Sequence, residues 1–257
     1  LGSHEFTTTS DVDIVLIYDA DDMSVLSNGP KPLGVNHYYA RLSQNFINSI
    51  TALTGEGKLY EVDMRLRPSG TAGPLAVSIE SFNDYQKGQA WTWEHMVLTR
   101  GRVISGPGPL RKKIEKTILS ILSHPGRDHD NLLHEVANMR GKLAENFATN
   151  NIWSMKNIRG GIIDIEFICQ YTLLAHGNKY PSILKRNTLR QLKEIKKAKI
   201  LNSDDVDTLS EACHIMQTSQ ALLRLCLGTT SKSKERPPAL LNALAARLET
   251  TPDKLES

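Results

Sequence analysis

The sequence predicts an α+β protein, in which a domain with a small mixed sheet is followed by an all-α helical bundle. β-Rich segments with alternating polar and apolar residues lie in the first part of the chain, around residues 11–18 and 59–68. From about residue 108, apolar residues recur at helical spacing, and only short loops separate the expected helices. The 257 residues, of which 40% are hydrophobic and 23% charged, suffice for two modest domains. We place these domains at residues 1–106 and 107–257.

The first expected strand is DVDIVLIY, residues 11–18. Because successive side chains of a strand point to opposite faces, Asp11 and Asp13 share one face and apolar residues occupy the other. The next segment, residues 21–34, contains Ser, Asn, Gly and two prolines, which predicts a loop.

An amphipathic helix is expected from Asn36, a suitable N-cap, because apolar residues follow it at helical spacing. The second strand, LYEVDMRLRP, ends at Pro68, which cannot donate to a strand ladder. Its alternation places Asp63, Arg65 and Arg67 on one face of the sheet.

The second part of the chain carries apolar stripes typical of bundle helices. One stripe comprises Leu132, Val136, Met139 and Leu143, and another comprises Val206, Leu209, Cys213, Met216, Leu223 and Leu227. The cysteines, Cys169, Cys213 and Cys226, show no CxxC spacing, so we expect buried small hydrophobic side chains, with no disulfide or zinc site. Trp91 and Trp93 are expected to pack at the domain junction.

Charge and hydropathy narrow the classes of function. The formal net charge of +3 is too small to indicate a nucleic-acid partner by itself. No apolar run approaches the roughly 20 residues of a membrane span, and no charged-then-apolar leader opens the chain, so we expect a cytoplasmic protein. The chain starts without methionine and stops as a new helical pattern begins, so we also expect a fragment of a longer protein.

Three aspartates carry the clearest chemical signal. Asp11 and Asp13 point the same way at the start of one strand, and Asp63 lies on another. Carboxylate oxygens are the ligands that Mg²⁺ prefers, and three carboxylates can hold two ions roughly 3.5–4 Å apart. One ion then activates the attacking oxygen and the other holds the leaving pyrophosphate, which is the arrangement of nucleotidyl transfer from a triphosphate such as ATP.

The remaining candidates would bind the triphosphate. Gly2 permits a tight turn that brings backbone N–H groups near phosphate oxygens, and Ser3 adds a hydroxyl donor. The forked donors of Arg65 and Arg67 can neutralise phosphate charge. Each signal also has an ordinary structural interpretation: a DxD sequence is often an Asx turn, and alternating Asp and Arg often form ion pairs on a solvated sheet face.

The combination is more specific than its parts. A Gly-Ser turn, a DxD strand, a helix and a further strand with another Asp resemble the DNA polymerase β-like nucleotidyltransferases. Four longer stretches resemble glutamine synthetase adenylyltransferase: SDVDIVLIYD, YEVDMRLRPSGTAGPL, DYQKGQAWTWEHMVLTRGRV and RGGIIDIEFICQY, at residues 10–19, 60–75, 84–103 and 159–171. Enzymes of that family have two similar nucleotidyltransferase halves, one that attaches AMP to a tyrosine of glutamine synthetase and one that removes it by phosphorolysis.

The resemblance implies an activity and its partners. RPSG at residues 67–70 and QAWTWEH at residues 89–95 resemble the C-terminal, AMP-attaching half, whereas the removing half typically has RPFG and a GR-x-WER pattern. The implied reaction transfers AMP from ATP with two Mg²⁺ ions, or Mn²⁺, and regulates nitrogen assimilation. Glutamine synthetase would be the protein substrate, with the PII signal protein and glutamine as regulators. The alternatives are the AMP-removing activity and a non-catalytic fragment that docks glutamine synthetase or PII.

The resemblance also assigns roles. Asp11 and Asp13 would bind both metals, Asp63 would complete the catalytic one and help to deprotonate the target tyrosine, and Gly2 with Ser3 would hold the triphosphate. These three aspartates are the predicted catalytic and metal-binding residues.

Other residues stay open between a structural and a functional role. Glu166 lies in a helix that is apolar nearly all round, so its carboxylate needs a partner such as Lys156, Arg159 or a substrate group. We include Lys156 and Glu166 among the candidate nucleotide-binding residues. Arg100 and Arg102 face either the nucleotide or solvent.

Overall fold

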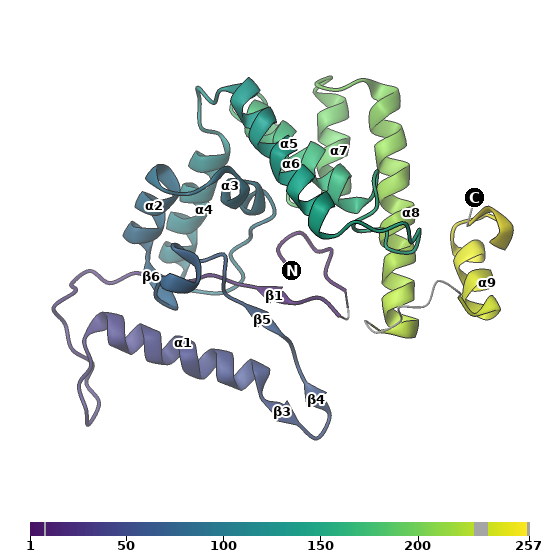
Figure 1. The fold of residues 1–257 in the computed structure, drawn as a ribbon. Coiled ribbons are helices and arrows are strands. Elements are labelled where there is room, and N and C mark those ends of the chain that lie inside the picture. The colour runs from purple at the N-terminus through teal and green to yellow at the C-terminus, as the bar shows by residue number, and fades with distance from the viewer. Residues whose placement is uncertain (8, 229–235, 256–257) are drawn as a thin grey trace. The chain divides into compact units, whose positions relative to one another are not determined.

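A computed structural model describes residues 1–7, 9–228 and 236–255 (Figure 1). The chain forms two compact units. Unit 1 comprises Leu1–Gly2, Ser10–His95 and Gly101–Ile121, and unit 2 comprises Ser3–Thr9, Met96–Arg100 and Leu122–Ser257. The division into domains at residues 106 and 107 stays a prediction. A small set of strands followed by helices confirms the predicted α+β class.

Unit 1 is built on short parallel strand pairs. β1 (Val12–Asp13) pairs with β5 (Val62–Asp63), and β2 (Leu16–Tyr18) pairs with β6 (Ala76–Ser78). The expected strand over residues 11–18 is therefore broken into two pieces that pair with different partners. The expected alternation holds at its start, where Val12 is buried between two exposed aspartates.

The second expected strand is shorter than predicted. Only Val62 and Asp63 form β5, because the chain then turns, with Arg67 N donating to Met64 O at 3.3 Å. The loop after this turn contains Ser69 and Gly70 at φ of 62° and 55°, in the left-handed region. A side chain at Gly73 would meet the Pro68 carbonyl oxygen at 2.1 Å, so only glycine fits there.

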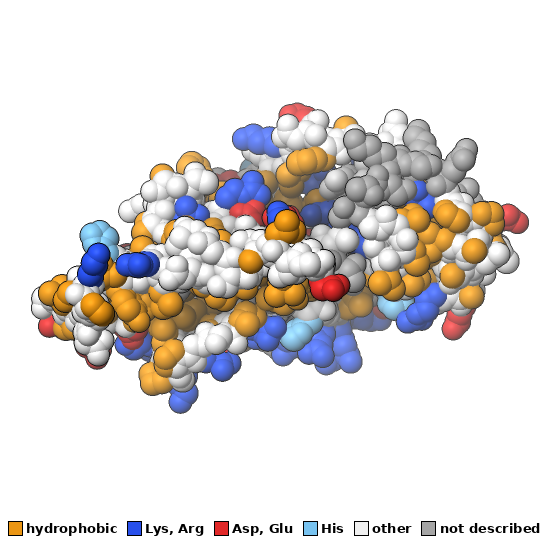
Figure 2. Space-filling view, turned by 90° about the horizontal axis from the view of Figure 1, so that it is seen from below, with side chains coloured by type: hydrophobic (Ala, Val, Ile, Leu, Met, Phe, Trp, Pro, Cys, Tyr) orange, Lys and Arg blue, Asp and Glu red, His pale blue; other side chains and the backbone are white. Residues whose placement is uncertain are grey.

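One helix of unit 1 presents apolar side chains to solvent. α1 (Val35–Thr51) starts after Gly34 as N-cap rather than at Asn36, whose side chain instead accepts a hydrogen bond from the Tyr18 hydroxyl at 2.6 Å. The antiparallel hairpin β3 (Leu53–Thr54) and β4 (Gly57–Lys58) follows. Exposed large apolar side chains on α1 are Tyr38, Leu42 and Phe46. Figure 2 shows hydrophobic side chains gathered on the part of unit 1 to which α1 belongs.

Three more helices complete the first part of the chain. They are α2 (Ile79–Gly88), α3 (Thr92–Leu98) and α4 (Gly108–Leu122). Trp91 and Trp93 are 70% and 37% exposed, and their expected packing at the domain junction stays a prediction. The short α3 instead buries Glu94 and Met96.

Unit 2 is helical. Its helices are α5 (His129–Asn146), α6 (Ile162–His176), α7 (Thr188–Lys197), α8 (Ser203–Leu227) and α9 (Pro238–Arg247). α6, α7 and α8 pack against one another, and α5 packs against α6 (Figure 1). Within the described ranges, no helix combines the length and apolarity that a membrane span requires.

The main core of unit 2 lies between α6, α7 and α8. It includes Ile165, Cys169, Leu173, Ile183, Leu192, Ile195, Val206 and Cys213. Cys169 and Cys213 are buried as expected, but Cys226 is exposed. Cys226 lies about 3.6 turns after Cys213 on α8, and that fraction of a turn carries it to the side away from the core.

Candidate active site

The parallel register of β1 and β5 places two of the predicted catalytic aspartates side by side. Asp13 and Asp63 are direct register partners, and their strands are joined by hydrogen bonds from Val12 N to Glu61 O at 2.8 Å and from Ile14 N to Asp63 O at 3.0 Å. Neighbouring strands lie about 4.8 Å apart, and partnered residues of a parallel pair point to the same face. The fold therefore brings together two carboxylates that are fifty positions apart in sequence.

Asp63 is held by an arginine from its own loop. Arg65 N donates to Asp63 Oδ1 at 2.8 Å, and the Arg65 guanidinium donates to Oδ2 through Nε at 2.7 Å and also through Nη2. The hydrogen bond from the Arg65 side chain lowers the pKa of Asp63 below its ordinary value, against the opposing effect of partial burial. Asp63 is therefore ionised at neutral pH, which is the form that binds cations.

Asp11 and Asp13 are exposed at the start of β1. Their negative charges act on the Arg65 guanidinium and help to raise its pKa, although the hydrogen bond and charge of Asp63 contribute more. All three aspartates thus influence the same guanidinium, which places them in one acidic region of unit 1.

The donor set suits a divalent cation in its chemistry, because carboxylate oxygens are hard ligands. Within the described part of the chain, however, no three His, Cys, Asp or Glu side chains lie close enough together to hold a metal ion. In addition, Arg65 donates to both oxygens of Asp63. A cation bound by all three aspartates requires Asp63 to exchange Arg65 for the metal.

Arg67 lies on a different side of the chain from Arg65. It is only 8% exposed, and its guanidinium donates to the carbonyl oxygens of Met64, Thr71 and Gly73 at 2.8, 3.3 and 3.1 Å. The expected alternation fails here because the chain turns after Met64. Arg67 thus stabilises the loop to which it belongs. Its role as a phosphate ligand stays a prediction.

The predicted Gly2-Ser3 turn is present, with Gly2 in unit 1 and Ser3 in unit 2. Ser3 is 4% exposed, and its hydroxyl oxygen accepts a hydrogen bond from Arg100 Nη2 at 3.2 Å. The Ser3 side chain is therefore directed into unit 2.

Glu166 on α6 has Arg100 as its ion-pair partner, at 2.6 Å from Nη1 to Oε1. The partners suggested by the sequence, Lys156 and Arg159, are both exposed. Arg100 is only partly exposed and also binds Glu5, at 2.7 Å from Nη2 to Oε2. Burial raises the pKa of Glu166 above its ordinary value, although the charges of Arg100 and Lys156 act in the opposite direction.

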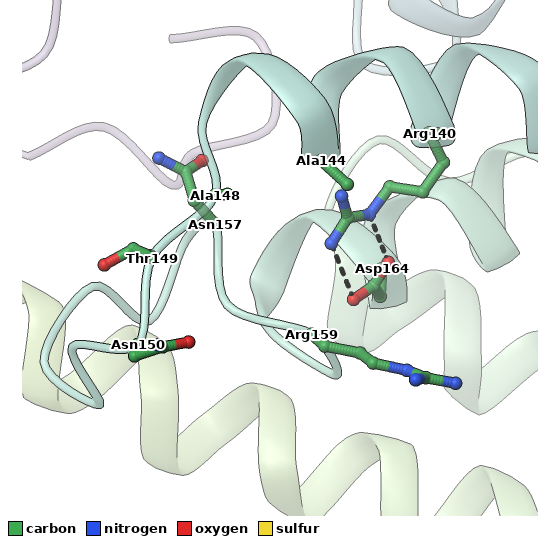
Figure 3. A pocket seen from close by; sticks show the side chains of 9 residues that line it. Arg140, Ala144, Ala148, Thr149, Asn150, Asn157, Arg159 and Asp164 are labelled. Atoms are coloured by element: carbon green, nitrogen blue, oxygen red, sulfur yellow. Dashed lines mark hydrogen bonds and ion pairs between the residues drawn. The ribbon is translucent and has the colours of Figure 1, made fainter.

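Unit 2 also contains a pocket of about 380 Å³ beside the start of α6 (Figure 3). Arg140 on α5 grips Asp164 in the first turn of α6 with two guanidinium nitrogens, and Asp164 Oδ2 also accepts from Gly160 N at 2.6 Å. Asp164 thus neutralises the positive end of the helix dipole, the capping role that its position indicates. None of the predicted site residues lines this pocket.

Sequence reasoning missed Glu5, whose carboxylate joins Arg100 to the helices of unit 2. No periodicity marks Glu5, because residues 3–7 form no helix or strand. Its signal in the sequence is an acidic residue between the Gly-Ser turn and Phe6, a setting in which a charge needs a partner.

Comparisons with known proteins match two parts of the chain to two described families. Residues 1–117 match the family described as glutamate-ammonia ligase adenylyltransferase, glutamate-ammonia ligase being another name for glutamine synthetase. Residues 133–252 match the family described as GlnD PII-uridylyltransferase. A helical region related to one nucleotidyltransferase family thus follows a region related to another.

Three curated relatives carry the name bifunctional glutamine synthetase adenylyltransferase/adenylyl-removing enzyme. The protein of Rhodopseudomonas palustris is 43% identical over 227 residues, 88% of this chain and 23% of the relative. That of Bradyrhizobium diazoefficiens is 41% identical over 253 residues, 98% of this chain and 25% of the relative. That of Xanthobacter autotrophicus is 39% identical over 254 residues, 98% of this chain and 26% of the relative.

The identity extends over both units, and the chain spans about a quarter of the length of these relatives. The resemblance predicted from the four sequence stretches is confirmed: the chain belongs to the family of bifunctional glutamine synthetase adenylyltransferase/adenylyl-removing enzymes.

Proposed function

We propose that this chain transfers AMP from ATP to a tyrosine hydroxyl of glutamine synthetase. The observation that carries the proposal is the register of β1 and β5, which puts Asp13 beside Asp63 on one face of a parallel pair. Asp11 lies on the same face of the chain two residues earlier. Paired carboxylates of this kind, in a family named for adenylyl transfer, support nucleotidyl transfer as the reaction.

In the proposed reaction Asp63 helps to remove the proton of the tyrosine hydroxyl, and the tyrosine oxygen attacks the α-phosphorus of ATP. The bond from that phosphorus to the oxygen of the β-phosphate breaks, and pyrophosphate leaves. Asp11, Asp13 and Asp63 would hold Mg²⁺, or Mn²⁺, which supplies positive charge to the triphosphate. Catalysis at phosphorus is then mostly positioning and charge neutralisation.

Arg65 is suited to act as a companion of the metal. It is exposed and paired with Asp63, so it can move from the carboxylate to a phosphate oxygen when a cation binds Asp63. Gly2 and the backbone of Ser3 would meet the triphosphate at the turn. Lys156 and Glu166 remain candidates for contact with the nucleotide.

Attachment of AMP is favoured over its removal by RPSG at residues 67–70 and QAWTWEH at residues 89–95, which resemble the attaching half of the family. The closest rival is removal of AMP by phosphorolysis. A further rival is a fragment that docks glutamine synthetase or the PII protein without catalysis. Regulation by PII and glutamine, and a cytoplasmic location, are further expectations of the same proposal.

The test is transfer of radioactivity from ATP labelled in its α-phosphate to purified glutamine synthetase. Asp13→Asn should abolish transfer and leave the melting temperature nearly unchanged, because Asp13 is exposed. Asp22→Asn is the matched control: Asp22 is also exposed in unit 1, but its carboxylate bonds Ser24 in a loop. Substantial transfer by the Asp13→Asn variant contradicts the proposal.

Two further incubations separate the rivals. Adenylylated glutamine synthetase incubated with phosphate yields ADP only if the chain removes AMP. A docking fragment binds glutamine synthetase or PII equally well after Asp11, Asp13 and Asp63 are all changed to alanine.

A further inference from the structure

Arg100 is the centre of an ion-pair network in unit 2. Its guanidinium donates to Ser3 Oγ at 3.2 Å and to Glu5 Oε2 at 2.7 Å through Nη2, and to Glu166 Oε1 at 2.6 Å through Nη1. One side chain therefore joins both ends of the tripeptide Ser3–Glu5 to α6.

Glu5 extends the network to the other core helices. Its Oε1 accepts from Thr188 N at 3.0 Å, at the start of α7, and from Gln217 Nε2 at 3.0 Å, on α8. Asn187 Nδ2 also donates to it at 3.3 Å. The Glu5 side chain is only 9% exposed, so this carboxylate is satisfied by protein donors and has little room for a ligand.

The residue between the two anchored positions has an unfavourable backbone. His4 is a non-glycine residue at φ of 64°, in the left-handed region. Such a conformation is unfavourable for a residue with a Cβ atom and persists where its surroundings impose it. Ser3 and Glu5 impose it here, because both side chains bind the same guanidinium.

A second contact fixes the segment farther along. Thr7 Oγ1 accepts from Arg224 Nη1 on α8 at 2.6 Å. Residues 3–7 are thus held at both ends by arginines of unit 2, and Asp11 follows a few positions later.

We propose that Arg100 is a positioning residue that clamps the Ser3–Glu5 turn onto α6, so that the turn presents its backbone N–H groups to the ATP triphosphate. The proposal rests on the proposed function. It also changes the predicted role of the Ser3 hydroxyl. This hydroxyl is buried against Arg100, so it holds the turn in place and does not bind phosphate. Arg100 acts through the turn on nucleotide binding and leaves the transfer step to other residues.

The test compares Arg100→Gln with the wild-type chain by two measurements. Hydrogen–deuterium exchange of residues 1–7 without nucleotide should speed up about tenfold or more, because the turn opens locally. The KM for ATP should rise about tenfold while kcat at saturating ATP stays within about threefold, since binding and not the transition state is affected. Arg100→Lys should give intermediate values, because it restores the charge without the fork.

Arg140→Gln is the matched control. It also removes a guanidinium from a carboxylate of α6, namely Asp164, but Arg140 has no contact with residues 3–7 among its hydrogen bonds. It should leave the exchange of residues 1–7 and the KM for ATP unchanged. Equal effects of Arg140→Gln and Arg100→Gln would show a general loosening of α6 and overturn the proposal.

Ser3→Ala keeps every ion pair and tests the turn if Arg100→Gln does not fold. A clamp predicts faster exchange of residues 1–7 in the absence of nucleotide, whereas a hydroxyl that only binds phosphate predicts no change. Unchanged exchange in this variant overturns the proposal. If the wild-type chain transfers no AMP, the proposed function fails, but exchange and calorimetric binding of Mg-ATP still decide whether the clamp exists and serves the nucleotide.

Discussion

The acidic residues of the two units have opposite environments. In unit 1, Asp11 and Asp13 are exposed on a two-residue strand, and Asp63 beside them is held by an exposed arginine. In unit 2, Glu5 and Glu166 lie on either side of a single guanidinium, and Glu5 accepts hydrogen bonds from three further groups. The partner of Asp63 in the first set is itself exposed, whereas the partners of the second set join buried carboxylates to the helices of unit 2.

The difference shows how burial distinguishes carboxylates that can bind ligands from carboxylates that stabilise the fold. An exposed carboxylate can exchange water for metal at little cost, so a site on short open strands can bind and release its ligands. A buried carboxylate needs a permanent partner, because removal of that partner leaves an uncompensated charge. We therefore expect substitution of the acidic residues at the start of β1 and in β5 to change activity, and substitution of the buried acidic residues of unit 2 to change stability.

The largest effect expected concerns Asp63. Asp63→Asn should lower AMP transfer by about a thousandfold or more, because the lost charge neutralisation is worth several kcal/mol. The melting temperature should change little. Radiolabel transfer measures the activity and calorimetry measures the melting temperature. A large fall in melting temperature would contradict the expected difference between the two sets of acidic residues.

The next effect concerns Glu5. Glu5→Gln should lower the free energy of unfolding by about 2–3 kcal/mol, because charged hydrogen bonds to Arg100 and Thr188 are weakened in a buried site. Urea denaturation followed by circular dichroism measures it. A change below about 0.5 kcal/mol, the size typical of surface positions, would mean that Glu5 is not part of the architecture.

Glu166 should show the opposite dependence on pH from Glu5. Burial raises the pKa of the Glu166 carboxyl above 4.5 in the folded chain. The charge of Glu5 acts in the same direction, whereas the charges of Arg100 and Lys156 act to lower this pKa. As pH rises from 4.5 through the raised pKa, the unfolded chain loses this proton first, so ionisation of Glu166 destabilises the fold.

Glu166→Gln removes that penalty. The variant should gain stability relative to the wild type as pH rises from 4.5 to 8. For Glu5, burial also acts to raise the pKa, but Arg100, Ser3 and Thr188 outweigh it and lower the pKa. Its contribution is therefore present above 4.5 and lost as pH falls. Urea titrations at several pH values distinguish the two signs, and parallel profiles would refute the assignment.

The smallest effect sharpens the comparison within unit 2. Lys196 binds Asp207 at 2.5 and 2.6 Å, but the two side chains are 40% and 61% exposed. Lys196→Gln should change the free energy of unfolding by less than about 0.5 kcal/mol, as is usual for exposed ion pairs. A loss of stability as large as that of Glu5→Gln would show that the helical context of an ion pair, rather than its burial, sets its contribution to the free energy of unfolding.

The parts of the fold that follow local periodicity were predictable. The alternation at Asp11–Asp13, the helical region from residue 108 and the stripe through Leu132 and Val136 all correspond to observed elements. Periodicity reports which side of an element meets the core, and this does not depend on distant residues.

The parts that depend on pairing were not predictable. Nothing local in the sequence indicates that Arg100 binds Glu166, because the two residues are far apart and each could have met solvent. Likewise, Arg67 leaves the face predicted for it because the chain turns after Met64, and the carbonyl oxygens that hold its guanidinium become available only once the loop has formed. Tertiary context decides which polar groups satisfy one another.

The placement of the thiols has a practical consequence for measuring these effects. Cys169 and Cys213 lie in the core of unit 2, and burial raises the pKa of the Cys213 thiol to about 12. Cys226 is exposed near the end of α8. A maleimide dye should therefore attach to the native chain at Cys226 alone, providing a single fluorescent reporter on unit 2 without any cysteine substitution.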